Sequence, residues 1–325
     1  MNLNSVPAAG VSQGDVRESV PIRCRSETDG GAGNQARPRR PHLQALAAPG
    51  EDGAVTEDGA VTAGRPAEAT AGPDHVPAWA RGVAAVAVLT GAGISTDSGI
   101  PDFRGPQGLW TKNPAAEKLS TYQVYMADPE TRRRSWRARL DHPAWAAQPN
   151  AAHQALARLA ASAIDTQVIT QNIDELHQRA GTPPERVIEL HGTMFRVVCT
   201  GCGDRTAMAD ALARVRAGEE DPPCARCGGI LKSATVMFGQ PLPPGVFERA
   251  AAAAARCDLL LAIGSTLTVE PAASLCAVAA GAGASLVIVN RDPTPYDPVA
   301  TAVIRDPIGQ AIPRIAGQLP AAGPE

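Results

Sequence analysis

The 325-residue sequence has no apolar run that approaches the roughly 18 residues of a membrane-spanning helix. Its first residues also lack the apolar core of about 7–15 residues that marks a secretory signal peptide. Charge of one sign is not in excess, since 30 Lys and Arg residues face 33 Asp and Glu residues and leave a net charge of −3. We therefore expect a cytoplasmic protein with no membrane partner and, for the chain as a whole, no nucleic-acid partner.

Large apolar side chains are almost absent from residues 1–75, which are rich in Gly, Ala, Pro, Arg and acidic residues. The hexapeptide EDGAVT occurs there twice in succession, at 51–56 and 57–62. Because such a segment cannot bury enough surface to offset its chain entropy, we predict a disordered, low-complexity extension. A misplaced start codon would produce the same pattern. The globular part is expected over residues 76–320, with a tail at 321–325.

Cysteines number seven, and four of them form two C-x-x-C pairs, Cys199/Cys202 and Cys224/Cys227. In a reducing compartment this pattern indicates a metal site and not disulfides. Two such pairs can complete a tetrahedral zinc site that has no open position, so the zinc is expected to be structural. Unrelated thiols, a redox pair and a nucleic-acid-binding ribbon are the alternatives, and the mixed charge between the pairs is unfavourable for the ribbon.

After residue 76, apolar runs typical of buried strands alternate with segments of helical spacing. This alternation predicts an α/β fold, a Rossmann-like parallel sheet with helices on both faces. The cysteine pairs fall between the third and fourth strands, so they predict a small inserted zinc-binding module at about 195–235. The expected strands are 83–90, 165–172, 186–192, 258–266 and 284–292, and a helix is expected at 151–162.

Small or polar residues follow four of these strands, at Gly91, Gln171–Asn172, Gly264–Thr266 and Asn290. Because ligands of parallel sheets bind at the carboxyl ends of the strands, we expect these residues to line one site. Gly91 and Gly93 would let backbone N–H groups approach a pyrophosphate there. His191 ends a predicted strand at the same edge, which favours a catalytic role for it over a structural one.

The stretch GAGISTDSGIPDFRG (91–105) departs from the dinucleotide pattern G-x-G-x-x-G, because Gly99 comes six residues after Gly93. A dehydrogenase would also need an acidic residue about 20 positions further on, in a strand-end context, to hold the ribose. Only Glu117 is near that distance, and it follows no predicted strand. The sequence therefore disfavours a dehydrogenase.

Over residues 76–320 the sequence resembles the sirtuins, which are NAD-dependent protein deacylases. The resemblance rests on GAGISTDSGIPDFRG, TQNID, HG, the two cysteine pairs, VMFGQPLP, GSTLTVEPAA and VIVNRD, in the family's order. It implies NAD and one structural zinc ion as cofactors, and acyl-lysine proteins as partners. The implied reaction cleaves NAD to nicotinamide and O-acyl-ADP-ribose while it frees the lysine.

The resemblance also implies roles for individual residues. His191 would be the general base, and Asn172 a second catalytic residue. Asp102 would lie near the nicotinamide carboxamide, Phe103 would shield the reactive face, and Arg104 would contact the phosphates. The substrate backbone would pair as a strand with the segment that holds Val236, Phe238 and Gly239. The implied NAD-binding residues are Gly91, Ala92, Gly93, Ser95, Asp102, Phe103, Arg104, Gln171, Asn172, Asp174, Gly264, Ser265, Thr266, Asn290, Arg291 and Ile308.

Two other functions stay open at this point, a protein ADP-ribosyltransferase on the same fold and a non-catalytic NAD-sensing zinc adaptor. The chain has Gln240 where the family often has glutamate. The segment RRRSWRAR (132–139) is more similar to the class II branch of the family. Arg134 and Arg137 are the nearest match to the Tyr–Arg pair of the desuccinylase branch, but the tyrosine is missing, and we interpret both arginines as a solvated helix face.

Overall fold

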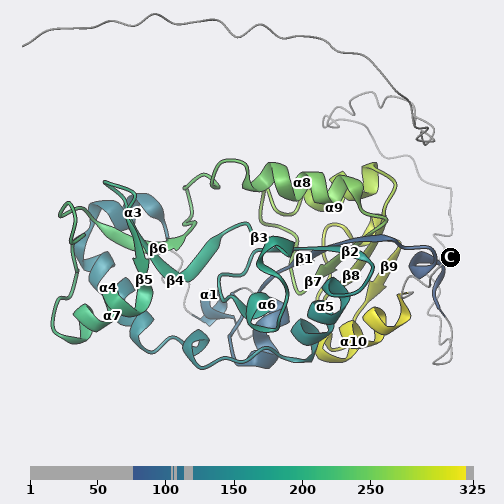
Figure 1. The fold of residues 1–325 in the computed structure, drawn as a ribbon, viewed down its shortest axis with the longest axis horizontal. Coiled ribbons are helices and arrows are strands. Elements are labelled where there is room, and N and C mark those ends of the chain that lie inside the picture. Colours follow the sequence, from purple (N-terminus) through teal and green to yellow (C-terminus); the bar gives the residue numbers. More distant parts are fainter. Residues whose placement is uncertain (1–75, 104, 106–107, 113–119, 320–325) are drawn as a thin grey trace, which may run out of the picture. The chain divides into compact units, whose positions relative to one another are not determined.

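The computed structural model describes residues 76–103, 105, 108–112 and 120–319 (Figure 1). The extension predicted for residues 1–75 and the tail predicted for 321–325 lie outside the described residues. Within the described part of the chain, no helix is both long and apolar enough to cross a membrane.

Six parallel strands form the main sheet, in the order β3-β2-β1-β7-β8-β9. The strand order runs outward in both directions from β1, so the topological switch point lies between β1 and β7. Thr90, the last residue of β1, pairs with Thr170 on one side and with Ile263 on the other. The strands are β1 (Ala85–Thr90), β2 (Asp165–Thr170), β3 (Val187–Glu189), β7 (Leu259–Ile263), β8 (Ser285–Val289) and β9 (Ala302–Ile304).

Helices cover both faces of this sheet, because its central strands carry apolar side chains on both sides. On β1, Val86 and Val88 belong to one buried cluster, while Ala87 and Leu89 belong to another. Two helices pack on the first cluster, α5 (Ala151–Ala160) and α10 (Ile308–Gln318), and two pack on the second, α8 (Val246–Arg256) and α9 (Leu275–Gly281) (Figure 1). The predicted α/β class with helices on both faces is therefore confirmed.

A second sheet of three antiparallel strands, in the order β5-β4-β6, carries the cysteine pairs. Its strands are β4 (Gly192–Cys199), β5 (Arg205–Ala207) and β6 (Leu231–Thr235). Helix α4 covers this sheet through Trp136, which is buried among Val197, Met208 and neighbouring apolar side chains. The small module thus includes a helix from residues 129–140, far from the cysteines in sequence, which the sequence analysis did not assign to it.

The helices of the described residues are mostly short. The α-helices are α1 (Leu109–Lys112), α3 (Tyr122–Ala127), α4 (Pro129–Leu140), α5 (Ala151–Ala160), α6 (Leu176–Arg179), α7 (Met208–Arg216), α8 (Val246–Arg256), α9 (Leu275–Gly281) and α10 (Ile308–Gln318). The 3₁₀ helices are η1 (Ala78–Ala80), η2 (Ala92–Ser98), η3 (Pro143–Trp145), η4 (Pro184–Arg186) and η5 (Asp297–Val299). Helix η2 follows β1 after one residue and α6 follows β2 after five, so both begin near the switch-point edge of the sheet.

Candidate functional site

Three glycines bring the ends of β1 and β7 into close contact. A Cβ atom on Gly91 would lie 2.7 Å from the carbonyl oxygen of Gly264, and one on Gly93 would lie 2.8 Å from Gly264 Cα. Gly264 itself has φ +61°, and a Cβ there would lie 2.5 Å from the backbone nitrogen of Ile94. Only glycine permits this approach without strain, so the switch point depends on all three.

The backbone amides of two of these glycines also form hydrogen bonds across the switch point. The N–H of Gly91 donates to the carbonyl of Ile263 at 3.0 Å, and the N–H of Gly93 donates to the carbonyl of Gly264 at 2.9 Å. These bonds and the close approach to Gly264 give the glycines a structural role at the switch point. The expectation that Gly91 and Gly93 let backbone N–H groups approach a pyrophosphate stays a prediction.

Asn172 and Asp174 follow β2 and tie its end to η2. The Asn172 side-chain amide donates to the carbonyl of Gly91 at 3.1 Å and to Ser95 Oγ at 3.2 Å. Ser95 Oγ donates in turn to Asp174 Oδ2 at 2.7 Å. Burial raises the pKa of Asp174, although the Ser95 hydroxyl and the Leu176 N–H favour its charged form. The structure thus brings together three residues that the sequence analysis placed in one site.

His191 is oriented by a backbone carbonyl. Its Nδ1 lies 2.9 Å from the carbonyl oxygen of Gln171, so Nδ1 must carry the proton and Nε2 is left as a free base. Burial lowers the pKa of the ring, which keeps it neutral at neutral pH, and the carbonyl contact partly opposes that shift. The Gln171 side chain reaches across to Ser265 Oγ at 3.0 Å and so joins the ends of β2 and β7.

The remaining predicted cofactor residues lie at the same edge of the sheet or close to it. Asp102 accepts from the N–H of Gly105 at 3.0 Å, and Phe103 keeps 38% of its surface exposed. Arg104 lies outside the described residues. Asn290 follows β8 and donates to the carbonyl of Asp292. Ala92 begins η2, Thr266 pairs with the hydroxyl of Thr268, Arg291 forms an exposed ion pair with Asp292, and Ile308 begins α10.

The segment expected to pair with substrate is partly engaged within the chain. The N–H of Val236 donates to the carbonyl of His191, and Phe238 exchanges backbone hydrogen bonds with Ser120 and Tyr122. The backbone N–H of Met237, between Val236 and Phe238, donates to the side-chain Oε1 of Gln240 at 3.3 Å. A substrate strand would therefore replace a side-chain contact at this segment. The side chain of Gln123, 3.4 Å from the Gly239 carbonyl, also lies along this segment.

The four paired cysteines form one cluster. All four Sγ atoms lie within 4.8 Å of one another, with Cys199–Cys227 at 3.5 Å and Cys202–Cys224 at 3.8 Å. A tetrahedral zinc ion with Zn–S bonds of about 2.3 Å needs sulfur atoms roughly 3.8 Å apart, so the cluster fits zinc. The backbone N–H of Cys202, assisted by that of Gly201, lowers the pKa of the Cys199 thiol to about 6. The geometry supports a structural zinc site.

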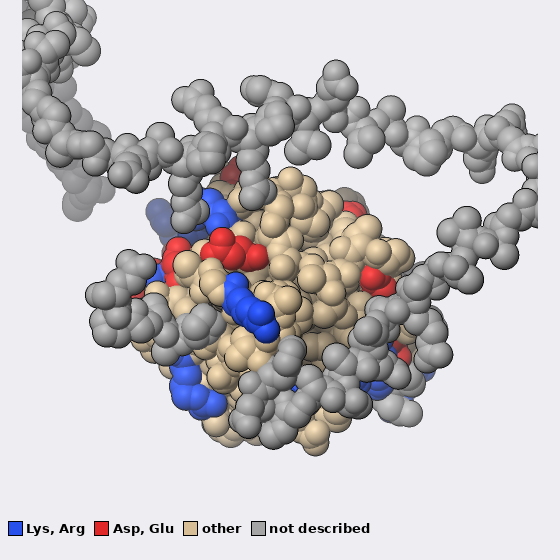
Figure 2. Space-filling view, turned by 90° about the vertical axis from the view of Figure 1, so that its right-hand side faces the viewer, with Lys and Arg blue, Asp and Glu red and all other residues tan. Residues whose placement is uncertain are grey.

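Charged side chains on one face of the molecule are sparse and mixed in sign. Figure 2 shows the face at the β9 end of the sheet, where acidic and basic residues lie singly or in small groups among uncharged surface. Arg291 and Asp292 pair with each other, as do Arg305 and Asp297. The expectation that no nucleic acid binds stays a prediction.

The fold and the site together define a class of protein. A parallel sheet with a ligand edge at its switch point, a neutral histidine beside that edge and an adjoining four-cysteine module are typical of a nucleotide-using enzyme with a structural metal. The model of the Sir2 family matches residues 91–271. The chain belongs to the Sir2 family, which confirms the resemblance stated from its motifs.

Relatives and solved structures agree with this membership. NAD-dependent protein deacetylase 2 of Streptomyces coelicolor is 58% identical over 71% of this chain and 95% of its own length. NAD-dependent protein deacetylase 1 of Bradyrhizobium diazoefficiens is 45% identical over 69% of this chain and 87% of its own. The structure of a Sir2 protein with p53 peptide and NAD⁺ matches with a TM-score of 0.65 and 35% identity, over 73% of this chain and 94% of that one.

Sequence reasoning missed several polar residues around the site. Thr90 and Thr170 end neighbouring strands in register, and their hydroxyl groups bond to each other. His177, in α6, contacts Thr90 Oγ1 at 3.1 Å. The signal that could have revealed them was the paired threonine at the end of two predicted strands, each followed by a predicted ligand residue.

Proposed function

We propose that this chain is an NAD-dependent protein-lysine deacetylase. NAD serves as the co-substrate: its nicotinamide leaves, its ADP-ribose accepts the acyl group, and one water molecule is consumed as the lysine amine is freed. The observation that carries the proposal is the orientation of His191, whose Nδ1–H is held by the Gln171 carbonyl while Nε2 remains unprotonated. A base at that position can take a proton from a ribose hydroxyl, which is the step that such a transfer requires.

Other residues of the chain hold and orient in this proposal. Asn172 and Asp174, fixed through Ser95, would hold the ribose and the carboxamide end of NAD. Ser265, Thr266, Asn290 and Arg291 would bind the phosphate and adenosine end, and Ile308 would contact the adenine. Asp102 would lie near the nicotinamide carboxamide, and Phe103 would shield the reactive face. Arg104 would contact the phosphates.

The substrate is proposed to be an acetyl-lysine peptide in extended conformation. A solved Sir2 structure with an acetylated peptide, at 33% identity and a TM-score of 0.65 over 74% of this chain and 95% of that one, supports this class of substrate. Phe238, 36% exposed, and the Val236–Gly239 segment would receive the peptide after the Gln240 side chain releases Met237. A cytoplasmic location and a place in the class II branch stay predictions from the sequence.

The test uses the purified full chain with zinc, NAD and an acetylated peptide, analysed by mass spectrometry. Nicotinamide and O-acetyl-ADP-ribose are expected from the wild type and from His142→Ala, which removes a histidine that caps η3 and has no role in the proposed mechanism. His191→Ala should release neither product while it keeps its zinc and its urea midpoint. Activity retained in His191→Ala would refute the role of this base.

Two other results would replace the proposal. ADP-ribose attached covalently to protein, with no acyl product, would identify an ADP-ribosyltransferase. Saturable NAD binding without NAD turnover, across acetyl, succinyl, lipoyl and longer fatty acyl peptides, would identify a non-catalytic NAD sensor.

A further inference from the structure

Two histidines that the proposed mechanism does not use lie buried behind the site. His153 in α5 is 0% exposed and His177 in α6 is 1% exposed, and their rings lie 5.0 Å apart. Among the described residues, His153 Nε2 and His177 Nδ1 are two of four buried side-chain atoms with no hydrogen-bond partner. Burying a polar atom without a hydrogen-bond partner costs free energy of folding, so this pair of histidines needs an explanation.

His177 connects directly to the end of the sheet. Its Nε2 lies 3.1 Å from Thr90 Oγ1, and Thr90 Oγ1 donates its only proton to Thr170 Oγ1 at 2.9 Å. Nε2 must therefore be the donor to Thr90, and Nδ1 is bare in the neutral ring. Thr170 Oγ1 also accepts from the backbone N–H of Asn172 at 3.0 Å. The chain of bonds thus runs from His177 to the backbone of Asn172.

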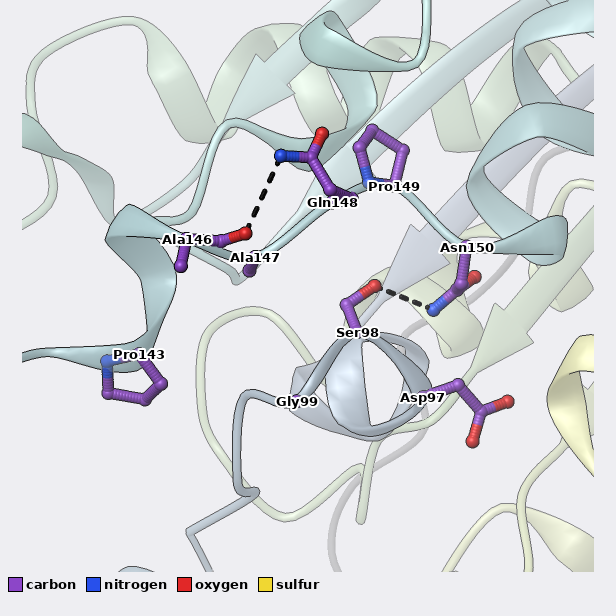
Figure 3. A pocket seen from close by; sticks show the side chains of 9 residues that line it. All are labelled: Asp97, Ser98, Gly99, Pro143, Ala146, Ala147, Gln148, Pro149 and Asn150. Atoms are coloured by element: carbon purple, nitrogen blue, oxygen red, sulfur yellow. Dashed lines mark hydrogen bonds between the residues drawn. The ribbon is translucent and has the colours of Figure 1, made fainter.

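His153 connects the same pair to η2. Its Nδ1 lies 3.0 Å from Asn150 Oδ1 and 3.4 Å from Asn150 N, so either tautomer ties the ring to Asn150. The Asn150 amide donates to the carbonyl of Ile94 at 2.8 Å and to Ser98 Oγ at 3.0 Å, the latter bond being drawn in Figure 3. Asn150 stands at the edge of a pocket of about 560 Å³ between η2 and the start of α5.

We propose that His177, packed against His153, is a positioning residue that fixes the backbone of Asn172 through Thr90 and Thr170. The hydrogen bonds of the two histidines thereby fix the positions, relative to each other, of the two segments that would hold NAD, 91–98 and 171–174. The inference rests on the proposed function, since it assigns the network a purpose in NAD use. Burial lowers the pKa of His177 to about 3 and that of His153 to about 4, which agrees with a pair that works in its neutral form.

The first test compares two valine variants on the same strand. Thr170→Val removes the hydroxyl that receives the Asn172 N–H, while Thr166→Val removes a buried hydroxyl at the other end of β2, bonded only to the carbonyls of Leu159 and Ile164. We expect kcat/KM for NAD to fall between about tenfold and hundredfold in Thr170→Val, with the peptide KM unchanged. Thr166→Val should match the wild type at an equal urea midpoint.

The second test uses rescue at His177. In His177→Gln the amide nitrogen takes the place of Nε2 and can still donate to Thr90, whereas the shorter His177→Asn places its amide near Nδ1. We expect His177→Gln to keep most of the NAD kcat/KM and His177→Asn to lose about tenfold. Equal values for the two, or equal values for Thr170→Val and Thr166→Val, would overturn the inference.

Failure of the proposed function would look different from failure of this inference. If the wild type turns over no NAD, the proposed function fails, and the NAD dissociation constant measured by calorimetry then decides the inference. Thr170→Val must bind NAD more weakly than Thr166→Val by about tenfold, and equal affinities would overturn it.

Discussion

Acid should destabilise this protein through the buried pair His153 and His177. Both rings are almost inaccessible to solvent, and burial lowers the pKa of His177 to about 3 and that of His153 to about 4. In the unfolded chain each ring has a pKa near 6.5 and binds a proton as the pH falls. Because the unfolded state then binds more protons than the folded state, the pair's contribution to stability is complete above about pH 6.5 and is lost as the pH falls toward 4.

The size of the effect follows from the protons taken up. Each proton bound only by the unfolded state changes the free energy of unfolding by about 1.4 kcal/mol per pH unit. Between pH 7 and pH 5 an unfolded histidine goes from about one quarter to almost fully protonated, which amounts to roughly 2 kcal/mol per ring. The pair should therefore cost about 4 kcal/mol over this interval, a large share of the stability of an ordinary domain.

Urea unfolding at pH 7 and pH 5 measures the pair's contribution to the free energy of unfolding. The wild type is compared with the double variant His153→Gln/His177→Gln. The double variant should lose about 4 kcal/mol less stability between the two pH values than the wild type loses. A fixed zinc concentration in every sample makes acid release of the metal common to both proteins. His142→Gln removes a histidine outside the pair whose pKa burial also lowers, and it should reduce the loss of stability by less than the double variant does. Equal losses in the wild type and in the double variant would refute the reasoning.

Three further predictions follow from the site. The acid limb of the pH–kcat/KM profile should lie below pH 6.5, because burial lowers the pKa of His191 and a base of lower pKa stays active in more acidic solution. An acid limb above pH 6.5 would contradict this expectation. Gly264→Ala should lower the free energy of unfolding by about 3 kcal/mol and weaken NAD binding. Gly82→Ala, at φ +65° but with nothing within 4 Å of the added Cβ, should cost only about 1 kcal/mol in urea unfolding. Elemental analysis should find one zinc per chain in the wild type and in Cys257→Ser, but none in Cys227→Ser. The small sheet of Cys227→Ser should also become susceptible to proteolysis. Full zinc in Cys227→Ser would count against the four-cysteine site.

Features set by local sequence were predictable. The apolar run of β7 is buried along its whole length, and such a run has few alternatives to a central strand. The two C-x-x-C pairs were equally informative, because metal chemistry restricts their spacing and the structure places all four sulfur atoms together. Strand ends were harder to predict. The strand expected at 165–172 ends at Thr170, because the N–H of Asn172 donates to the Thr170 hydroxyl and not to a neighbouring strand.

Features set by contacts between distant segments were not predictable. The arginine-rich segment at 132–139 resembled a solvated helix, and Arg134 and Arg137 are indeed exposed. Arg132, however, is buried and pairs with Asp221 at 2.7 Å, a residue 89 positions away. Pattern analysis of one segment cannot reveal such a partner. The same holds for Gly91 and Gly93, whose amides pair with Ile263 at the end of β7 and with Gly264 directly after it.

His191 occupies the joint between the two sheets. It directly precedes Gly192, the first residue of β4, and its carbonyl accepts from the N–H of Val236, which follows β6. His191 is therefore anchored on both sides to the sheet that carries the four paired cysteines. A preparation that is partly depleted of zinc should then behave as a mixture of competent and incompetent molecules, and turnover numbers for this enzyme should be normalised to bound zinc instead of total protein.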